Sequence, residues 1–168
     1  MALLIDGYNL LNASGIGAGA GKGNILHRAR LALLNFLART LDPQEAAHTT
    51  VVFDAQASPP GLPKRFVHHG LTVRFAARYA DADSLIEELI LADTAPRRLT
   101  VVSSDHRVQR AARRRGARAV DSEVWYGQMA RRHRQPRQSP PDKPTPPSLP
   151  LSEEEIAYWL EQFGDGAA

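Results

Sequence analysis

The fold is decided by residues 2–12, which read ALLIDGYNLLN. The first four of these residues form a continuous apolar run that stops at Asp6, a pattern typical of a buried strand. Such a strand needs helices on both faces of its sheet, because neither of its own faces carries polar side chains. These residues therefore predict the central part of a helix-covered sheet.

Strand-like and helical segments alternate along the rest of the chain. Short apolar or β-branched runs lie at residues 49–53, 71–75, 99–102 and 118–120. Apolar residues at helical spacing mark residues 25–41, 83–91, 108–115 and 122–132. Because this alternation is typical of parallel sheets, we expect an α/β fold with a mostly parallel central sheet.

The composition indicates a globular protein and excludes several kinds of site. The 168 residues are 43% hydrophobic and 23% charged, which is sufficient to bury a core. The lack of cysteine excludes disulfides, thiolate zinc sites, iron–sulfur clusters and thiol nucleophiles. No apolar run approaches the roughly 18 residues of a membrane span, and residues 1–11 do not resemble a signal peptide. We therefore expect a cytoplasmic protein that does not contact a membrane.

Positive charge is concentrated in the middle of the chain. Residues 97–137 carry 12 arginines and only 3 acidic side chains, whereas residues 138–168 carry one lysine and 6 acidic side chains. A basic segment of this kind favours a polyanionic partner such as nucleic acid, although an arginine-rich, solvated helical face would give the same pattern.

The chain is expected to divide into three parts. Residues 136–150 contain seven of the twelve prolines and therefore predict an extended linker. We expect a folded domain at residues 1–134, a proline-rich linker at 135–150 and an amphipathic helix at 151–168. The helix begins with a capping box and carries an apolar stripe, formed by Ile156, Trp159, Leu160 and Phe163. A helix of this length is marginal alone, so it should dock on the body or on a partner.

Four aspartates lie where the predicted strands end. Asp6 and Asp54 directly follow strands, Asp105 follows another after two serines, and Asp83 begins a helix after the strand at 71–75. Because parallel strands end at one edge of a sheet, these carboxylates should meet there. Carboxylates that close stay ionised together only around a cation, and hard oxygen ligands suit Mg²⁺ or Mn²⁺. The alternative is that each aspartate merely caps a helix.

Four segments carry a resemblance to a known family. They are LIDGYNLLN (residues 4–12), VVFDA (51–55), YADADSLIEEL (79–89) and VVSSDHRVQRAARRRGA (101–117). In this order they resemble the NYN branch of the PIN-like nuclease superfamily, and within it the YacP-like group. The resemblance implies a PIN-like three-layer α/β/α sandwich and metal-dependent RNA cleavage. One bacterial branch of the group is a ribosome-associated endoribonuclease.

The same resemblance assigns roles to particular acidic residues. Asp6, Asp83 and Asp105 match the metal-binding acids of the family, and Asp54 matches the acid of its FDA segment. Asn9 matches the asparagine of DGYN, which orients the site or contacts a phosphate.

Two serines belong to the same motifs. Ser104 stands where the family often has Thr or Ser, and it either binds a ligand water or caps the next helix. Ser84 replaces the second acid of an Asp-Glu pair, which removes one carboxylate from the site. Asp81 and Glu87 are the candidates to compensate, because Glu87 lies on the same helical face as Asp83.

Residues for RNA contacts are also suggested by their positions. Arg107, Arg110 and Arg114 share one helical face by their three- and four-residue spacing, and guanidinium groups bind phosphates well. Tyr8 and Tyr79 lie close to the expected crevice, where they would either stack on a splayed base or pack into the core.

These observations predict an endoribonuclease that depends on Mg²⁺ or Mn²⁺ and acts on single-stranded or ribosome-bound RNA. By the resemblance, its products carry 5′-phosphate and 3′-hydroxyl ends. Two alternatives remain: a catalytically weak or inactive RNA-binding or ribosome-docking module on the same fold, and an adaptor that acts through its C-terminal helix.

Overall fold

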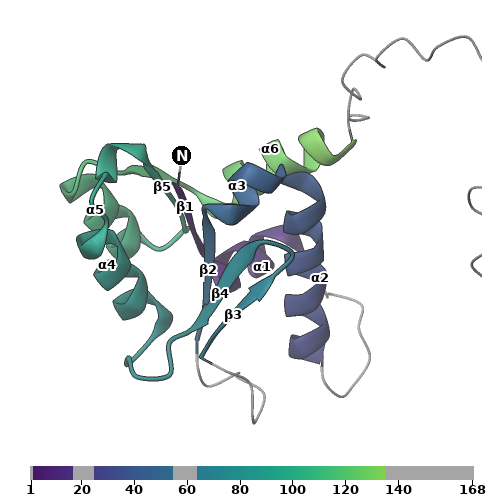
Figure 1. Ribbon diagram of the computed structural model, residues 1–168, viewed down its shortest axis with the longest axis horizontal. Helices are drawn as coiled ribbons and strands as arrows, with labels where there is room; N and C mark the ends of the chain where they lie inside the picture. The colour runs from purple at the N-terminus through teal and green to yellow at the C-terminus, as the bar shows by residue number, and fades with distance from the viewer. Residues whose placement is uncertain (1, 17–24, 55–63, 135–168) are drawn as a thin grey trace, which may run out of the picture. The chain divides into compact units, whose positions relative to one another are not determined.

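The computed structural model describes residues 2–16, 25–54 and 64–134, and these contain a six-stranded sheet (Figure 1). Its strand order is β3-β4-β2-β1-β5-β6. The strands are β1 (Ala2–Asp6), β2 (Thr49–Phe53), β3 (Arg65–His68), β4 (Leu71–Phe75), β5 (Leu99–Val102) and β6 (Arg118–Val120). Only β3 runs antiparallel to its neighbour, so the predicted mostly parallel sheet is confirmed.

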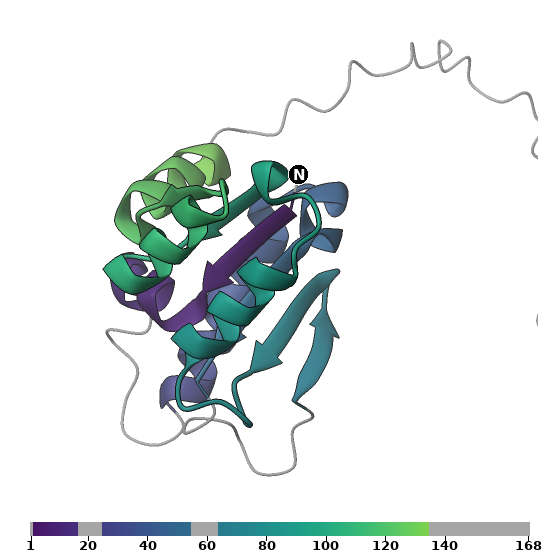
Figure 2. The same ribbon diagram turned by 90° about the vertical axis from the view of Figure 1, so that its left-hand side faces the viewer.

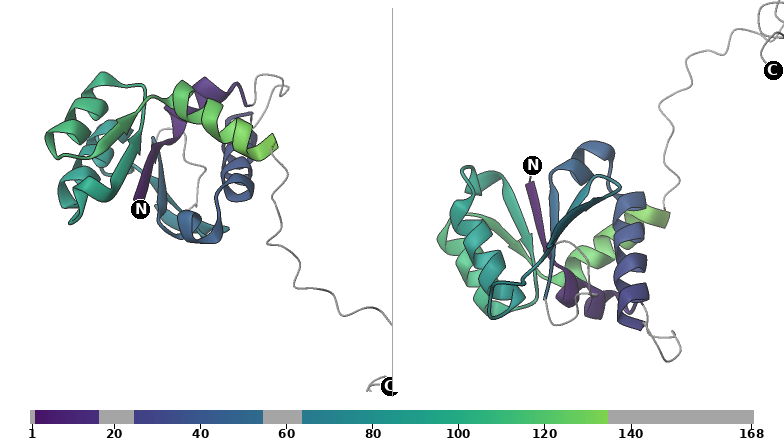
Figure 3. Two further views of the ribbon diagram at one scale, coloured as in Figure 1. Left: turned by 90° about the horizontal axis from the view of Figure 1, so that it is seen from above. Right: turned by 60° about the horizontal axis from the view of Figure 1, so that its bottom comes forward.

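Helices cover both faces of this sheet. They are α1 (Gly7–Ser14), α2 (Ile25–Thr40), α3 (Pro43–Ala47), α4 (Ala82–Ala92), α5 (His106–Arg114) and α6 (Ser122–Arg134), with a 3₁₀ turn, η2, at Pro96–Arg98. Helices α4 and α5 lie on one face, and α1, α2 and α6 lie on the other (Figures 1, 2 and 3). This arrangement confirms the expected three-layer α/β/α architecture.

Successive residues of the central strand face opposite cores, which explains its continuous apolar run. Leu4 packs in the cluster under α4 and α5, whereas Ile5 packs in the cluster under α1, α2 and α6. The neighbouring strand β2 does the same, with Val52 on the first side and Val51 on the second. Apolar residues on both faces are what a sheet covered by two helical layers requires.

Helix α1 and strand β3 were not expected from the sequence, and neither were helix α3 and the turn η2. Helix α1 begins directly after β1, where the Asp6 side chain caps it, and it ends at Gly15 with φ of 65°. Strand β3 pairs antiparallel with β4 across a turn in which His69 and Gly70 both have positive φ. These elements are short, so none carries enough periodic residues to be recognised by pattern alone.

The predicted linker at 135–150 and the predicted helix at 151–168 lie outside the described residues. Within the described ranges, no helix is both long enough and apolar enough to cross a membrane.

The start of α1 rests directly on the aromatic core. A Cβ atom added to Gly7 would lie 2.3 Å from Cε1 of Phe53, a distance that real Cβ atoms do not reach. Glycine at this position therefore allows α1 to turn sharply away from β1 and to hold its first residues against the Phe53 ring.

Replacing Gly7 with alanine is expected to destabilise the protein by about 1–3 kcal/mol, the range typical of overpacked cores. Urea unfolding followed by circular dichroism measures the change in the free energy of unfolding. Gly127→Ala is the matched control, because that glycine lies within α6 and nothing stands within 4 Å of an added Cβ. The control should be neutral or stabilise by up to about 1 kcal/mol. Equal stabilities for the two variants would contradict the packing argument.

Candidate functional site

The aspartates predicted at the strand ends come together at one edge of the sheet. Asp6 is the last residue of β1, Asp54 follows β2 directly, and Asp105 follows β5 after two serines. Strands β2, β1 and β5 are parallel neighbours, so their carboxyl ends lie side by side. Asp83 lies in the first turn of α4, which packs over β1 and β2.

Asp6 is a buried carboxylate that accepts three hydrogen bonds. It is 3% exposed and caps α1, accepting a hydrogen bond from the backbone N–H of Asn9 at 3.1 Å. The Asn9 side-chain amide donates a short hydrogen bond to Oδ2 of Asp6. The hydroxyl of Ser103 donates to the same oxygen at 3.1 Å. Asn9 thus orients Asp6, one of the roles that the family resemblance implies for it.

Ser103 links two of the acids, a role that the sequence did not reveal. While its Oγ donates to Asp6, it accepts the backbone N–H of Asp105 at 3.1 Å. Ser104, the serine singled out from the sequence, instead accepts the backbone N–H of Ser122 at 3.2 Å. Ser104 therefore anchors the start of α6, whereas Ser103 joins the ends of β1 and β5.

Asp105 both caps a helix and belongs to the acidic cluster. Its side chain accepts the backbone N–H groups of Arg107 at 2.6 Å and Val108 at 3.3 Å, and so begins α5. Asp6 caps α1 in the same way. Helix capping and participation in the cluster are thus compatible, because capping occupies only some of the lone pairs of a carboxylate.

The acids influence one another electrostatically. The pKa of Asp83 is raised to about 6, first by burial and then by the negative charges of Asp105 and Asp6. Burial also raises the pKa of Asp6 against the effect of its hydrogen bonds, and the charge of Asp105 contributes in the same direction. Carboxylates that raise one another's pKa in this way repel each other, and a bound cation would relieve that repulsion.

The donor chemistry of this edge fits Mg²⁺ or Mn²⁺, which prefer carboxylate oxygens. Within the described ranges, however, no group of three His, Asp or Glu side chains lies where it could hold a metal ion. Mg²⁺ usually retains several waters and is held by one or two carboxylates, so a group of three is not needed. Asp6, Asp83 and Asp105 are the residues from which one or two such ligands would come.

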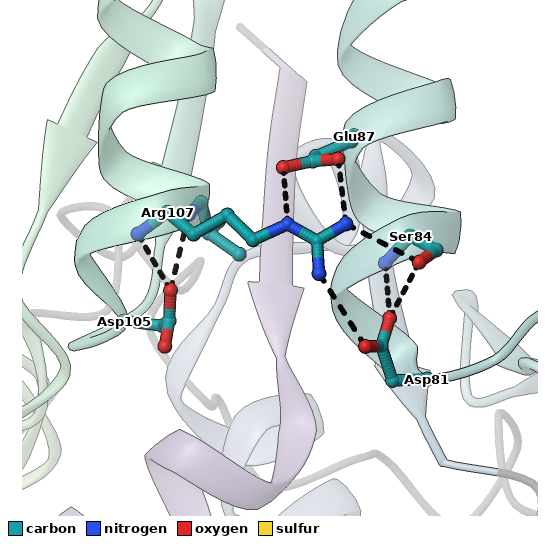
Figure 4. A network of polar contacts seen from close by, with 6 residues as sticks. Asp81, Ser84, Glu87, Asp105 and Arg107 are labelled. Carbon is teal, nitrogen blue, oxygen red and sulfur yellow. Dashed lines mark hydrogen bonds and ion pairs between the residues drawn. The ribbon is translucent and has the colours of Figure 1, made fainter.

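Arg107 joins α5 to α4 across this edge (Figure 4). Its Nε and Nη2 donate to the two carboxylate oxygens of Glu87 at 2.8 and 3.0 Å. It also reaches Asp81 and the Ser84 hydroxyl, both at 3.4 Å. The guanidinium that was predicted to bind phosphate is therefore engaged by the protein itself.

Ser84, which stands where the resemblance implies a second acid, is hydrogen-bonded to Asp81 at the start of α4. Asp81 caps α4 by accepting the backbone N–H and the hydroxyl of Ser84, at 2.8 and 2.6 Å. These hydrogen bonds, helped by the charge of Arg107, lower the pKa of Asp81. Asp81 and Glu87, the candidates to compensate for the missing acid, thus both pair with Arg107.

The arginines of α5 fall into two groups. Arg113 bonds to Gln109, and Arg115, just beyond the helix, donates to the carbonyl oxygens of Leu91 and Asp93. Arg110 and Arg114 are exposed and have no polar partner among the described residues. These two guanidinium groups are available to an external anion.

The two tyrosines predicted near the crevice are held by contacts within the domain. The ring of Tyr8 packs edge-on against Phe53, with 5.3 Å between the ring centroids. Burial raises the pKa of Tyr8, and the charge of Asp54 adds to the rise while that of Arg30 opposes it. The hydroxyl of Tyr79 donates to Glu88 on α4 at 2.7 Å.

Comparisons with known proteins agree with this architecture. A family model for the YacP-like NYN domain matches residues 3–162. Two crystal structures of Rae1 (YacP) from Bacillus subtilis are similar to this chain. The first is 28% identical with a TM-score of 0.60 and covers 79% of this chain and 76% of that one. The second, a point variant, is 27% identical with a TM-score of 0.55 and covers 79% of both chains. No curated protein matches the sequence.

The chain therefore belongs to the YacP-like NYN domain family, a family of PIN-like nucleases. This membership confirms the resemblance seen in the sequence motifs. The matched region continues beyond the described body, through the proline-rich segment and as far as residue 162.

Asp83→Asn is expected to stabilise the metal-free protein at about pH 8 by about 1 kcal/mol, after allowance for partial exposure of the carboxylate. The folded protein holds the Asp83 proton up to about pH 6, whereas the ordinary pKa of an aspartate is 3.8. Ionised Asp83 therefore opposes folding above that pH. The stability gain should shrink as the pH falls through 6 and vanish below the ordinary value.

Urea unfolding in the presence of a chelator, repeated across this pH range, measures the effect. Asp81→Asn is the matched control, because the pKa of Asp81 is shifted in the opposite direction. This control should lose stability at neutral pH. A destabilised Asp83→Asn protein at neutral pH would argue against charge repulsion at the site.

Proposed function

We propose that this chain is a divalent-metal-dependent endoribonuclease that cleaves single-stranded or ribosome-bound RNA. Asp6, Asp83 and Asp105 hold Mg²⁺ or Mn²⁺, and Asp54 supports the site from the end of β2. When bound, such an ion lowers the pKa of water and neutralises charge that develops on the phosphoryl oxygens. Membership of a nuclease family supports this assignment.

The protein's own groups prepare the site in three ways. Asn9 and Ser103 fix the orientation of Asp6 through hydrogen bonds to its carboxylate. The Arg107 bridge holds the first turns of α4 and α5 together and thereby sets the separation of Asp83 from Asp105. Arg110 and Arg114 bind flanking phosphates of the RNA.

One observation carries the proposal: the Ser103 hydroxyl joins Asp6 to Asp105 at the ends of β1 and β5, and Asp83 lies close enough for their charges to raise its pKa beyond the effect of burial. The sequence distance between these residues is large, and the fold gathers them at an unfavourable electrostatic cost. Residues with perturbed pKa values that cluster in this way are characteristic of functional sites.

Asp105→Asn should abolish cleavage while leaving the fold intact, because asparagine also caps helices well. We expect manganese-dependent cleavage of labelled single-stranded RNA to fall by about 100-fold or more, since even groups outside the ligand shell contribute about 10- to 100-fold. Asp121→Asn is the matched control, because Asp121 accepts a backbone N–H near the start of α6. Cleavage that survives Asp105→Asn undiminished, or persists in a chelator, would refute the catalytic assignment.

The alternative function is an RNA-binding or ribosome-docking module with little or no catalysis. Ser84 in place of an acid favours it, as does the pairing of both Asp81 and Glu87 with Arg107. Such a module would bind RNA with the salt dependence expected of the nuclease. The wild-type protein would nevertheless show no turnover with Mn²⁺.

Replacing Arg110 and Arg114 together with glutamine should weaken RNA binding and flatten its salt dependence. Each lost phosphate contact to single-stranded RNA lowers the slope of log K against log salt by about 0.7. The slope should therefore fall by about 1–2 in fluorescence anisotropy titrations. Arg113→Gln is the matched control on the same helix, because Arg113 already bonds to Gln109. An unchanged slope in the double variant would exclude this face as the phosphate track.

We further propose that residues 1–134 form the catalytic domain, residues 135–150 a linker, and residues 151–168 a docking helix in a partly separate role. The alternative, an adaptor whose function lies in that helix, predicts that deletion of residues 136–168 removes the function. Under our proposal the shortened protein retains cleavage.

A further inference from the structure

A hollow lies between α2 and the β3–β4 pair, and none of the residues assigned to the metal lines it. Its volume is about 140 Å³. Its walls are mainly apolar, with Leu31, Leu34, Phe66, Val73 and Phe75 lining it. Three nitrogen-containing side chains, His27, Arg30 and His68, complete the lining. No carboxylate contributes to it among the described residues, so the hollow suits a neutral or anionic ligand.

This hollow lies beside the acidic edge of the sheet. Phe75, which forms part of its wall, is the last residue of β4 and pairs in register with Phe53 of β2. The residue after Phe53 is Asp54, and the Phe53 and Phe75 rings lie 5.9 Å apart. The hollow is therefore within reach of a ligand that lies along the acidic edge.

Arg30 makes this hollow unlike an ordinary gap in the core. The residue is only 5% exposed, yet it forms no ion pair with a carboxylate among the described residues. Its guanidinium lies 5.3 Å from the centre of the Phe75 ring. Its Nη1 forms no well-aligned hydrogen bond within the described ranges. The polar group beside the guanidinium is the Tyr8 hydroxyl, whose pKa is raised by burial and lowered, against that effect, by the charge and hydrogen bonding of Arg30. A buried donor without an acceptor is costly, and a ligand carbonyl would remove that cost.

We propose that this hollow is a subsite for one unpaired nucleobase of the RNA, a proposal that rests on the RNA-directed function proposed above. The base stacks against Phe66 and Phe75, whose rings are themselves stacked at 6.3 Å, and offers a carbonyl oxygen to Arg30. Unpaired bases in RNA complexes are bound in this way, by aromatic faces and by guanidinium groups. A cavity of about 150 Å³ accepts benzene, so the volume suits a single six-membered ring.

An apolar side chain of a protein partner is the competing occupant. Leu31 and Val67 are exposed on the same two elements and would extend a protein-binding surface. The buried cation favours the base, because an aliphatic side chain leaves Nη1 without an acceptor. The absence of carboxylates from the described lining also favours a polyanion over a basic peptide.

The test measures RNA binding by the Asp105→Asn protein, in which the RNA stays intact. The probes are a fluorescein-labelled uridine octamer and an abasic octamer with the same number of phosphates. Two variants alter the hollow in different ways: Leu31→Trp fills it and Phe66→Ala removes one wall. Leu26→Trp and Val67→Ala are matched controls on the same helix and strand, at residues that do not line the hollow. Thermal unfolding verifies that each variant is folded.

We expect the parent protein to bind the uridine octamer at least about fivefold more tightly than the abasic one, the lower limit for one base–aromatic stack. Leu31→Trp and Phe66→Ala should each remove this preference without changing the affinity for the abasic octamer. Both controls should retain the preference.

Other results overturn the proposal. If the parent binds both octamers but the two hollow variants keep the preference, the base subsite is wrong while the RNA-directed function stands. If the parent binds both octamers equally, the base subsite is also wrong while the RNA-directed function stands. This result would favour a protein side chain as the occupant. If the parent binds neither octamer, the base subsite and the proposed RNA-directed function both fail.

Discussion

The burial of the Asp6 carboxylate at the end of the central strand is the constraint on which the rest of the site depends. A carboxylate that is almost fully removed from water must be hydrogen-bonded to remain tolerable, and here Asn9 and Ser103 supply those bonds. Because the same Ser103 hydroxyl accepts the backbone N–H of Asp105, satisfying the first acid also positions a second. A single hydroxyl group thus joins two members of the acidic cluster.

The charged groups around the acids show how far the repulsion between the carboxylates is compensated. Asp83 is left with a raised pKa near Asp105 and Asp6, whereas Asp81, two residues earlier, is stabilised in its ionised form by its capping bonds and by Arg107. Asp83 therefore shares the excess negative charge of the strand ends, whereas Asp81 and Glu87 of the same helical region are compensated by Arg107. A chain with Arg107 free would present a more acidic helix to an approaching phosphate.

Much of this organisation could be predicted from the sequence. Apolar runs that stop at aspartates define buried strands, and parallel topology then requires their ends to meet, so the convergence of Asp6, Asp54 and Asp105 followed from the sequence alone. The partner of Arg107 could not be predicted in this way. Helical spacing places it with Arg110 and Arg114, but a long side chain reaches whichever acid the packing of the next helix brings near. The choice between Ser103 and Ser104 likewise depends on the path of a short loop, which residue spacing does not determine.

The contact between Gly7 and the Phe53 ring joins the hydrophobic core to the chemistry at the sheet edge. Helix α1 begins against that ring, and Asp6 caps α1. The position of the carboxylate therefore depends on the position of the ring. Tyr8 and Phe75 also pack against the same ring. A residue with no reactive group of its own therefore helps to set where the first acid points. The hydrophobic core and the acidic edge of the sheet are thus coupled through one phenylalanine ring.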